Sequence, residues 1–165
     1  VMALQQTLVL VKPDGVARGL TGEIIKRFEQ RGLKIVALKL VKVNMDHAKQ
    51  HYTDDITKRR GEKVRTMLLD FITEGPVVAM IIEGVDAIAN VRKIVGATES
   101  KSALPGTIRG DFASIESYAV ADNEKRVLRN LIHASDTPDN AKHEIALWFK
   151  KEELHSYSKE LDRHF

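Results

Sequence analysis

The sequence contains no cysteine. A disulfide framework, a zinc site built on thiolates and a cysteine nucleophile are therefore all excluded. No apolar run approaches the ~20 residues that a membrane-spanning helix needs. The first residues, Val1 to Gln6, also lack the basic stretch and the long apolar stretch of a secretion signal. We therefore expect a cytoplasmic protein with no membrane partner.

The chain also lacks a large excess of positive over negative charge. The chain has 26 Lys and Arg residues against 23 Asp and Glu residues, a net charge of +3. This small excess favours a small polyanionic ligand, whereas nucleic acid usually requires clustered positive charge. The length of 165 residues is near the commonest size of one domain, so we expect a single domain over residues 1–165.

Alternating strand and helix patterns run through most of the chain. Apolar, β-branched runs predict strands at 7–11, 34–42 and 77–82, and a short one near 130–133. Helical patterns lie between them, with Asn44 or Asp46, Asp86 and Thr137 as helix caps. From Ala97 to Asp111 the periodicity vanishes, which predicts a long functional loop. The element order is typical of an α+β sandwich in which helices cover one sheet.

Several cationic residues are candidates for binding an anion. Lys12 directly follows a buried strand, and Arg92, Thr98 and Arg109 bracket a loop punctuated by glycine. Guanidinium groups bind phosphate oxygens bidentately, and a threonine hydroxyl adds a donor. The chain has no Walker loop. Taken singly, Lys12 is more readily explained as a solvated lysine at a strand end, and each arginine as part of a surface ion pair.

His133 is the candidate nucleophile. It ends a short apolar strand beside Ser135 and Asp136, and one ring nitrogen can attack phosphorus if a hydrogen bond fixes the other. Glu144 lies on the helix that follows and could fold back toward the imidazole. A Ser-His-Asp hydrolase lacks support because the Gly-x-Ser-x-Gly elbow is absent.

The other histidines are weaker candidates. His47 and His51 have the four-residue spacing of helical metal ligands, but without a third ligand nearby we do not expect zinc. His143, His155 and His164 are expected at the surface.

Together these segments resemble the nucleoside diphosphate kinase family over nearly the whole chain. The order and spacing of the matching runs make the similarity specific. These runs are Val11–Val16, Gly22–Glu29, Gly75–Met80, Gly96–Thr98, Pro105–Phe112 and Asn130–Asp136.

The resemblance implies a ferredoxin-like βαββαβ fold, a four-stranded antiparallel sheet covered by helices. It also implies a ping-pong reaction in which the γ-phosphoryl group of a nucleoside triphosphate passes to a nucleoside diphosphate through phospho-His133. Glu144 would orient His133, with Tyr52 close by. Arg92, Thr98 and Arg109 would hold phosphates, while Lys12 and Asn130 would reach sugar and phosphate.

The same resemblance implies Mg²⁺ as cofactor, held mainly through nucleotide phosphates without a protein metal site. It also implies a homo-oligomer, with a hexamer expected. The alternative is a non-catalytic nucleotide or nucleic-acid binding protein on the same fold, but the presence of His133, Glu144, Arg92 and Arg109 favours the enzyme.

Two departures from the family pattern bear on the base site. The family commonly carries a base-stacking aromatic residue in a Pro-Phe-Phe-like run, whereas this chain reads Thr57 to Val64 without an aromatic residue. Val64 falls nearest the expected position. Extra residues also lie between Phe112 and Asn130, which could reshape the nucleotide entrance or the subunit contacts.

Overall fold

The computed structural model describes residues 4–160, and its centre is a four-stranded antiparallel sheet. The strands are β1 (Leu4–Val11), β2 (Lys34–Lys42), β3 (Pro76–Val85) and β4 (Ile132–Ala134). Their order across the sheet is β2-β3-β1-β4, with every neighbouring pair antiparallel. This arrangement confirms the expected ferredoxin-like α+β fold.

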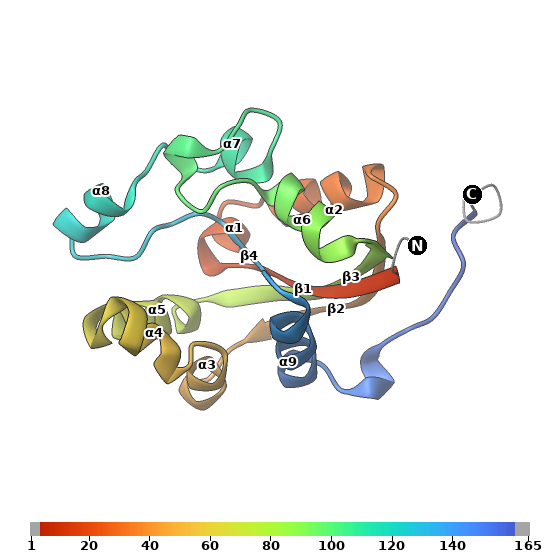
Figure 1. The fold of residues 1–165 in the computed structure, drawn as a ribbon, viewed down its shortest axis with the longest axis horizontal. Helices are drawn as coiled ribbons and strands as arrows, with labels where there is room; N and C mark the ends of the chain where they lie inside the picture. The colour runs from red at the N-terminus through yellow and green to blue at the C-terminus, as the bar shows by residue number, and fades with distance from the viewer. Residues whose placement is uncertain (1–3, 161–165) are drawn as a thin grey trace.

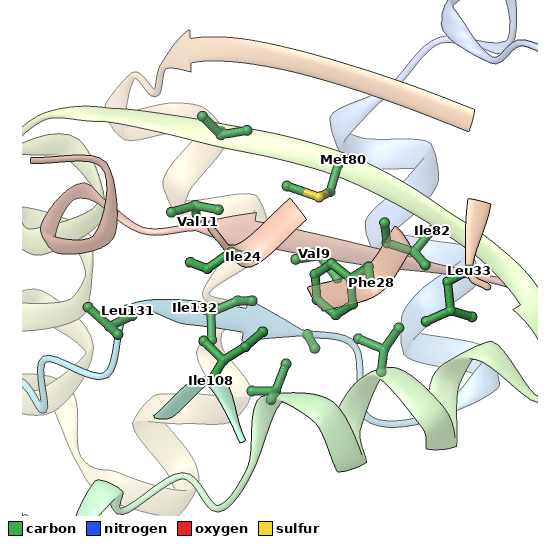
Figure 2. Close-up of a cluster of buried hydrophobic side chains, with 14 of the residues drawn as sticks. Val9, Val11, Ile24, Phe28, Leu33, Met80, Ile82, Ile108, Leu131 and Ile132 are labelled. Carbon is green, nitrogen blue, oxygen red and sulfur yellow. The ribbon is translucent and has the colours of Figure 1, made fainter. Parts of the chain in front are cut away.

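Side chains alternate between the two faces of the sheet, so each face has its own core. Val9 and Val11 of β1 face a cluster that includes Ile24 and Phe28 of the first long helix, and Figure 2 shows these side chains together with Met80 and Ile82. Leu8 and Leu10 face the second cluster on the opposite side. Helices therefore cover both faces, as Figure 1 shows.

The helices divide between the two faces. Those on the face of Val9 include α2 and α6, and those on the face of Leu8 include α3, α5 and α9 (Figure 1). The bounds are α1 Pro13–Ala17, α2 Thr21–Gln30, α3 Met45–His51, α4 Asp54–Arg60, α5 Glu62–Thr73, α6 Ala87–Val95, α7 Ile108–Phe112, α8 Tyr118–Asn123 and α9 Pro138–Trp148, with 3-10 turns η1 Ser100–Ser102 and η2 Lys151–Glu153. Within residues 4–160 every helix is too short or too polar to span a lipid bilayer.

Some helix boundaries follow the sequence pattern and some do not. The Asn44 side chain accepts a hydrogen bond from His47 N, and that of Thr137 accepts one from Asn140 N, so both residues cap their helices. Asp86 occupies the cap position of α6 in a left-handed conformation, but its side chain makes no capping hydrogen bond. The prediction that Asp86 is the cap residue of this helix is therefore confirmed, although the cap lacks a side-chain hydrogen bond.

The predicted loop from Ala97 to Asp111 is less irregular than its sequence indicates. It contains η1 and most of α7, where the Thr107 side chain accepts a hydrogen bond from Gly110 N as an N-cap. The extra residues after Phe112 form a further short helix, α8. These elements span six residues or fewer, too few for an apolar period to appear in the sequence.

Candidate active site

All nine predicted site residues line one cavity of about 460 Å³. They come from the end of β1, from α3 and α5, from α6 and the loop after it, from α7, and from the segment around β4 and α9. These residues are Lys12, Tyr52, Val64, Arg92, Thr98, Arg109, Asn130, His133 and Glu144. Residues far apart in the sequence thus meet in one site, which supports treating them as a set.

His133 lies at the middle of β4, paired with Leu10 of β1, and its side chain is 26% exposed. Its Nε2 is 2.5 Å from Oε2 of Glu144, which lies on α9 and is buried. A carboxylate can only accept a hydrogen bond, so Nε2 donates and the proton belongs on that nitrogen. Nδ1 then keeps its lone pair, and no described residue hydrogen-bonds to it.

His51, which the sequence ranked low, is a neighbour of His133. The two rings pack edge to face with centroids 4.7 Å apart. Trp148 Nε1 donates to His51 Nδ1 at 3.1 Å, and burial lowers the pKa of His51 well below its ordinary value. His51 is therefore neutral near pH 7, and its 3.6 Å approach to Glu144 is not an ion pair. The only signal in the sequence is its position beside Tyr52.

His51, His133 and Glu144 have potential metal-ligating atoms within 4.8 Å of one another. However, His133 Nε2 and Glu144 Oε2 are in direct hydrogen-bonding contact, and His51 Nδ1 already accepts from Trp148. An ion between His133 and Glu144 would require ligand atoms farther apart, because each metal–ligand bond is about 2 Å long. As it stands, the trio is a His133–Glu144 hydrogen bond with the His51 ring packed beside it.

Lys12 is a buried cation that lines the same cavity as His133 and Glu144. Its side chain is held by the Asn130 carboxamide oxygen, and Asn130 in turn donates to the Thr98 carbonyl at 2.7 Å. Burial lowers the pKa of Lys12 to about 8, although Asp14 nearby opposes the shift. A buried, desolvated lysine that lines a cavity is suited to binding an anionic ligand.

Arg109 and Arg92 differ in how firmly they are held. The buried Arg109 guanidinium donates to the backbone carbonyls of Asn130, Gly96 and Ile132, at 3.2, 3.1 and 2.6 Å. Burial and the nearby Arg92 lower the pKa of Arg109 to about 10, so it stays charged. Arg92 makes one longer contact, to the Ala134 carbonyl at 3.4 Å. Arg109 therefore supports the β4 backbone as well as contributing charge.

The turn after β1 fixes the backbone that leads into β4. Leu131 adopts a left-handed conformation with φ of 71°, unusual for a leucine. Its N–H donates to the buried Asp14 carboxylate at 3.0 Å, and its carbonyl accepts from Lys12 N at 2.8 Å. A Cβ on Gly15 would lie 2.9 Å from that same carbonyl oxygen. The run from Lys12 to Gly15 thus sets the position of His133.

Neither Ser135 nor the other histidines complete a hydrolase site. Ser135 is fully buried, and its hydroxyl bonds to the backbone of Leu8. His143 and His155 are exposed, as expected, whereas His164 lies outside the described residues. His133, with cationic residues in the same cavity, therefore remains the candidate nucleophile.

Comparison with known proteins decides the family. The nucleoside diphosphate kinase family model matches residues 5–154. The chain is 48% identical over 160 residues to a nucleoside diphosphate kinase of Borreliella burgdorferi, covering 96% of this chain and 95% of that one. It is 45% identical to the enzyme of Pyrococcus furiosus, covering 96% and 91%. The chain belongs to the nucleoside diphosphate kinase family.

Solved nucleoside diphosphate kinases have the same fold. The enzyme from Borrelia burgdorferi, in a transition-state mimic with bound vanadate and ADP, superposes with a TM-score of 0.93 at 47% identity, covering 96% of this chain and 95% of that one. The Halobacterium salinarum enzyme in complex with CDP superposes with a TM-score of 0.83 at 39% identity, covering 98% of this chain and 97% of that one. Nucleoside-diphosphate kinase activity follows from these full-length matches.

Proposed function

We propose that this nucleoside diphosphate kinase works by a ping-pong mechanism through a phosphohistidine at His133. The observation that carries the proposal is the hydrogen bond of His133 Nε2 to Glu144, which leaves Nδ1 free beside a cavity lined by cations. A histidine whose second nitrogen is fixed in this way is a competent nucleophile.

In the first half-reaction, Nδ1 of His133 forms a bond to the γ-phosphorus of a nucleoside triphosphate as the bond from phosphorus to the β,γ-bridging oxygen breaks. The diphosphate product leaves with that oxygen. In the second half, a terminal oxygen of another diphosphate attacks the phosphohistidine and the N–P bond breaks. Glu144 accepts the hydrogen bond from Nε2–H throughout, and its negative charge stabilises the positive charge that develops on the ring.

Lys12, Arg92 and Arg109 would neutralise the phosphate oxygens. Phosphoryl transfer depends mainly on alignment and charge stabilisation, which positioned cations supply. Thr98 and Asn130 would add polar contacts to phosphate and sugar, and Tyr52 would pack beside the histidine pair. Val64 in the cavity wall would touch the base.

The donor set fits magnesium that arrives with the nucleotide. Among the described residues the one three-membered cluster of possible ligands includes two imidazoles, whereas Mg²⁺ prefers oxygen and usually keeps several waters. Phosphates would therefore hold the ion, and when bound it supplies further neutralisation of their charge. All other contributions to the reaction are assigned to the side chains named above.

A homo-oligomer, with a hexamer expected, is part of the proposal. β2 is an edge strand of the sheet, and its Leu38 and Leu40 side chains are 52% and 67% exposed. Leu104 and Ile115 are exposed elsewhere on the surface. Edge strands with exposed leucines favour pairing with another chain.

The test is acid-labile, base-stable labelling of the protein by ATP. The wild-type protein should form a phosphoenzyme that transfers its phosphoryl group to a nucleoside diphosphate. His133→Ala should lose both steps while its circular dichroism spectrum and melting temperature stay close to wild type. Undiminished labelling of His133→Ala would contradict the proposal, and nucleotide binding without any phosphoenzyme in the wild type would support the non-catalytic alternative.

A further inference from the structure

Part of the cavity lining is apolar. This part comes from α4, α5 and the segment from Tyr118 to Leu128, and it includes Ile56, Val64, Met67, Leu68, Val127 and Leu128. Two tyrosines also line the cavity. Tyr52 is buried against His51, so Tyr118 is the aromatic residue on the side of the extra segment.

Tyr118 is held in place by the segment that carries it. It is the first residue of α8, where the Ser117 side chain accepts a hydrogen bond from Val120 N. Just before it, Glu116 forms a bidentate pair with Arg126, at 2.7 and 3.0 Å, and also accepts from Arg129 N. These bonds close the extra segment on itself and reduce the conformational freedom that Tyr118 would lose on binding a ligand.

The ring of Tyr118 already contacts a flat cation from the opposite wall. The Arg60 guanidinium, at the end of α4, lies 4.1 Å from the ring centroid. Figure 1 shows α8 and α4 at the same end of the molecule, on opposite sides of the sheet. A guanidinium is planar and stacks on aromatic faces much as a nucleobase does, so the ring is available to a planar ligand from that direction.

We propose that Tyr118 stacks on the nucleobase and that the incoming base displaces Arg60 from the ring. Val64 and its apolar neighbours then contact the base from the other walls. The extra segment thereby supplies the aromatic residue that the run from Thr57 to Val64 lacks. This inference rests on the proposed function, since it needs the phosphates at the cationic part of the same cavity.

The experiment measures the dissociation constant of ADP for wild type, Tyr118→Leu and Tyr118→Phe at fixed magnesium. Base stacking on an aromatic side chain corresponds to roughly a 5- to 140-fold change in affinity. Tyr118→Leu should weaken ADP binding by a factor in this range. The ADP affinity of Tyr118→Phe should stay close to that of wild type. The loss should be larger for purine than for pyrimidine diphosphates, because their rings offer more area.

Inorganic tripolyphosphate is the base-free probe. Its affinity should be nearly the same in wild type and Tyr118→Leu. An equal loss for ADP and tripolyphosphate would overturn the inference, because Tyr118 would then only shape the cavity. Unchanged ADP affinity in Tyr118→Leu would overturn it as well. Tyr157→Leu is the matched control, since Tyr157 also lies beneath a cation, Lys34, but does not line the cavity.

Arg60→Gln separates stacking from a structural contact between the walls. If the base displaces Arg60, this variant should bind ADP as well as wild type or more tightly. A loss equal to that of Tyr118→Leu, for ADP and tripolyphosphate alike, would overturn the inference. Labelling at saturating ATP distinguishes failure of this inference from failure of the proposed function. If Tyr118→Leu forms a phosphoenzyme and binds ADP as tightly as wild type, only this inference is contradicted. If the wild-type protein forms no phosphoenzyme, the proposed function is contradicted.

Discussion

The reactivity that we propose for His133 depends on the neighbouring carboxylate of Glu144. Glu144 holds Nε2 at 2.5 Å and so determines which nitrogen is free. Partners of this kind typically change activity by 10- to 100-fold when they are altered.

Glu144→Gln should therefore slow phosphoenzyme formation by roughly 10- to 100-fold. The amide can still contact Nε2, but it does not stabilise positive charge on the ring. Single-turnover labelling at saturating ATP measures the rate. Wild-type kinetics in this variant would mean that the carboxylate does not orient the nucleophile.

Lys12 should make nucleotide affinity depend on pH. Its pKa of about 8 means that the ammonium form prevails at pH 7 and declines as pH rises through 8. A bound phosphate favours the ammonium form, so binding takes up a proton above that pH. The ADP dissociation constant should rise by up to about fivefold between pH 8 and 9. Lys12→Gln should bind ADP weakly, with little pH dependence in this range. A flat wild-type profile would show that Lys12 does not contact phosphate.

Arg92 and Arg109 should differ on substitution. A hydrogen bond to a charged group is worth ~1.5–3 kcal/mol, so Arg92→Ala should lose roughly one to two orders of magnitude in kcat/KM, alike for ATP and GTP. Arg109→Ala should lose at least as much and also lower the melting temperature, because three backbone carbonyls lose their donor. A loss confined to one base would contradict a phosphate role for Arg92.

At the scale of elements, the strands were largely predictable and the short helices were not. Residues 77–82 of β3 form an unbroken apolar run, and this part of the strand was predicted correctly. α7 and α8 have five and six residues, and the side-chain caps at Thr107 and Ser117 define their start more than any apolar pattern does. Local sequence therefore indicates long elements more reliably than short ones.

Within the site, the same limit applies to His51. The sequence placed His133, Glu144 and the cations in one site through their resemblance to a family. His51 reaches His133 only because α3 packs near α9, where Trp148 donates to its ring. A packing contact between residues 97 positions apart leaves no local pattern in the sequence.

The turn at α1 allows a test of how elements position the nucleophile. In Gly15→Ala the new Cβ would lie 2.8 Å from Val11 Cγ1 and 2.9 Å from the Leu131 carbonyl oxygen. Such overpacking typically costs about 1–3 kcal/mol, and the shift should pass through Leu131 to His133. We expect a lower melting temperature and slower phosphoenzyme formation. Gly22→Ala is the matched control, since nothing lies within 4 Å of its added Cβ. Equal melting temperatures for the two variants would contradict this account.

At the scale of the whole molecule, the edge strand β2 should be covered by another copy of the chain. Leu40→Asp would place a charge where a subunit is expected to pack, so the assembly should dissociate toward smaller species. Sedimentation velocity measures the mass, and Leu40→Val serves as the conservative control. An unchanged mass for Leu40→Asp would show that β2 lies outside the subunit contacts.

The contact between Arg60 and Tyr118 also has a kinetic consequence. A cation–π pair at an exposed site is worth about 0.5–1 kcal/mol. This energy favours the state in which Arg60 contacts the Tyr118 ring by roughly two- to fivefold over the separated state. Exposed side chains rearrange in picoseconds to nanoseconds, whereas typical enzymes turn over 1–10³ times per second. In the proposed ping-pong cycle, two nucleotides enter the cavity and two leave it. The Arg60–Tyr118 pair therefore opens many times per catalytic cycle and does not limit the rate of nucleotide exchange.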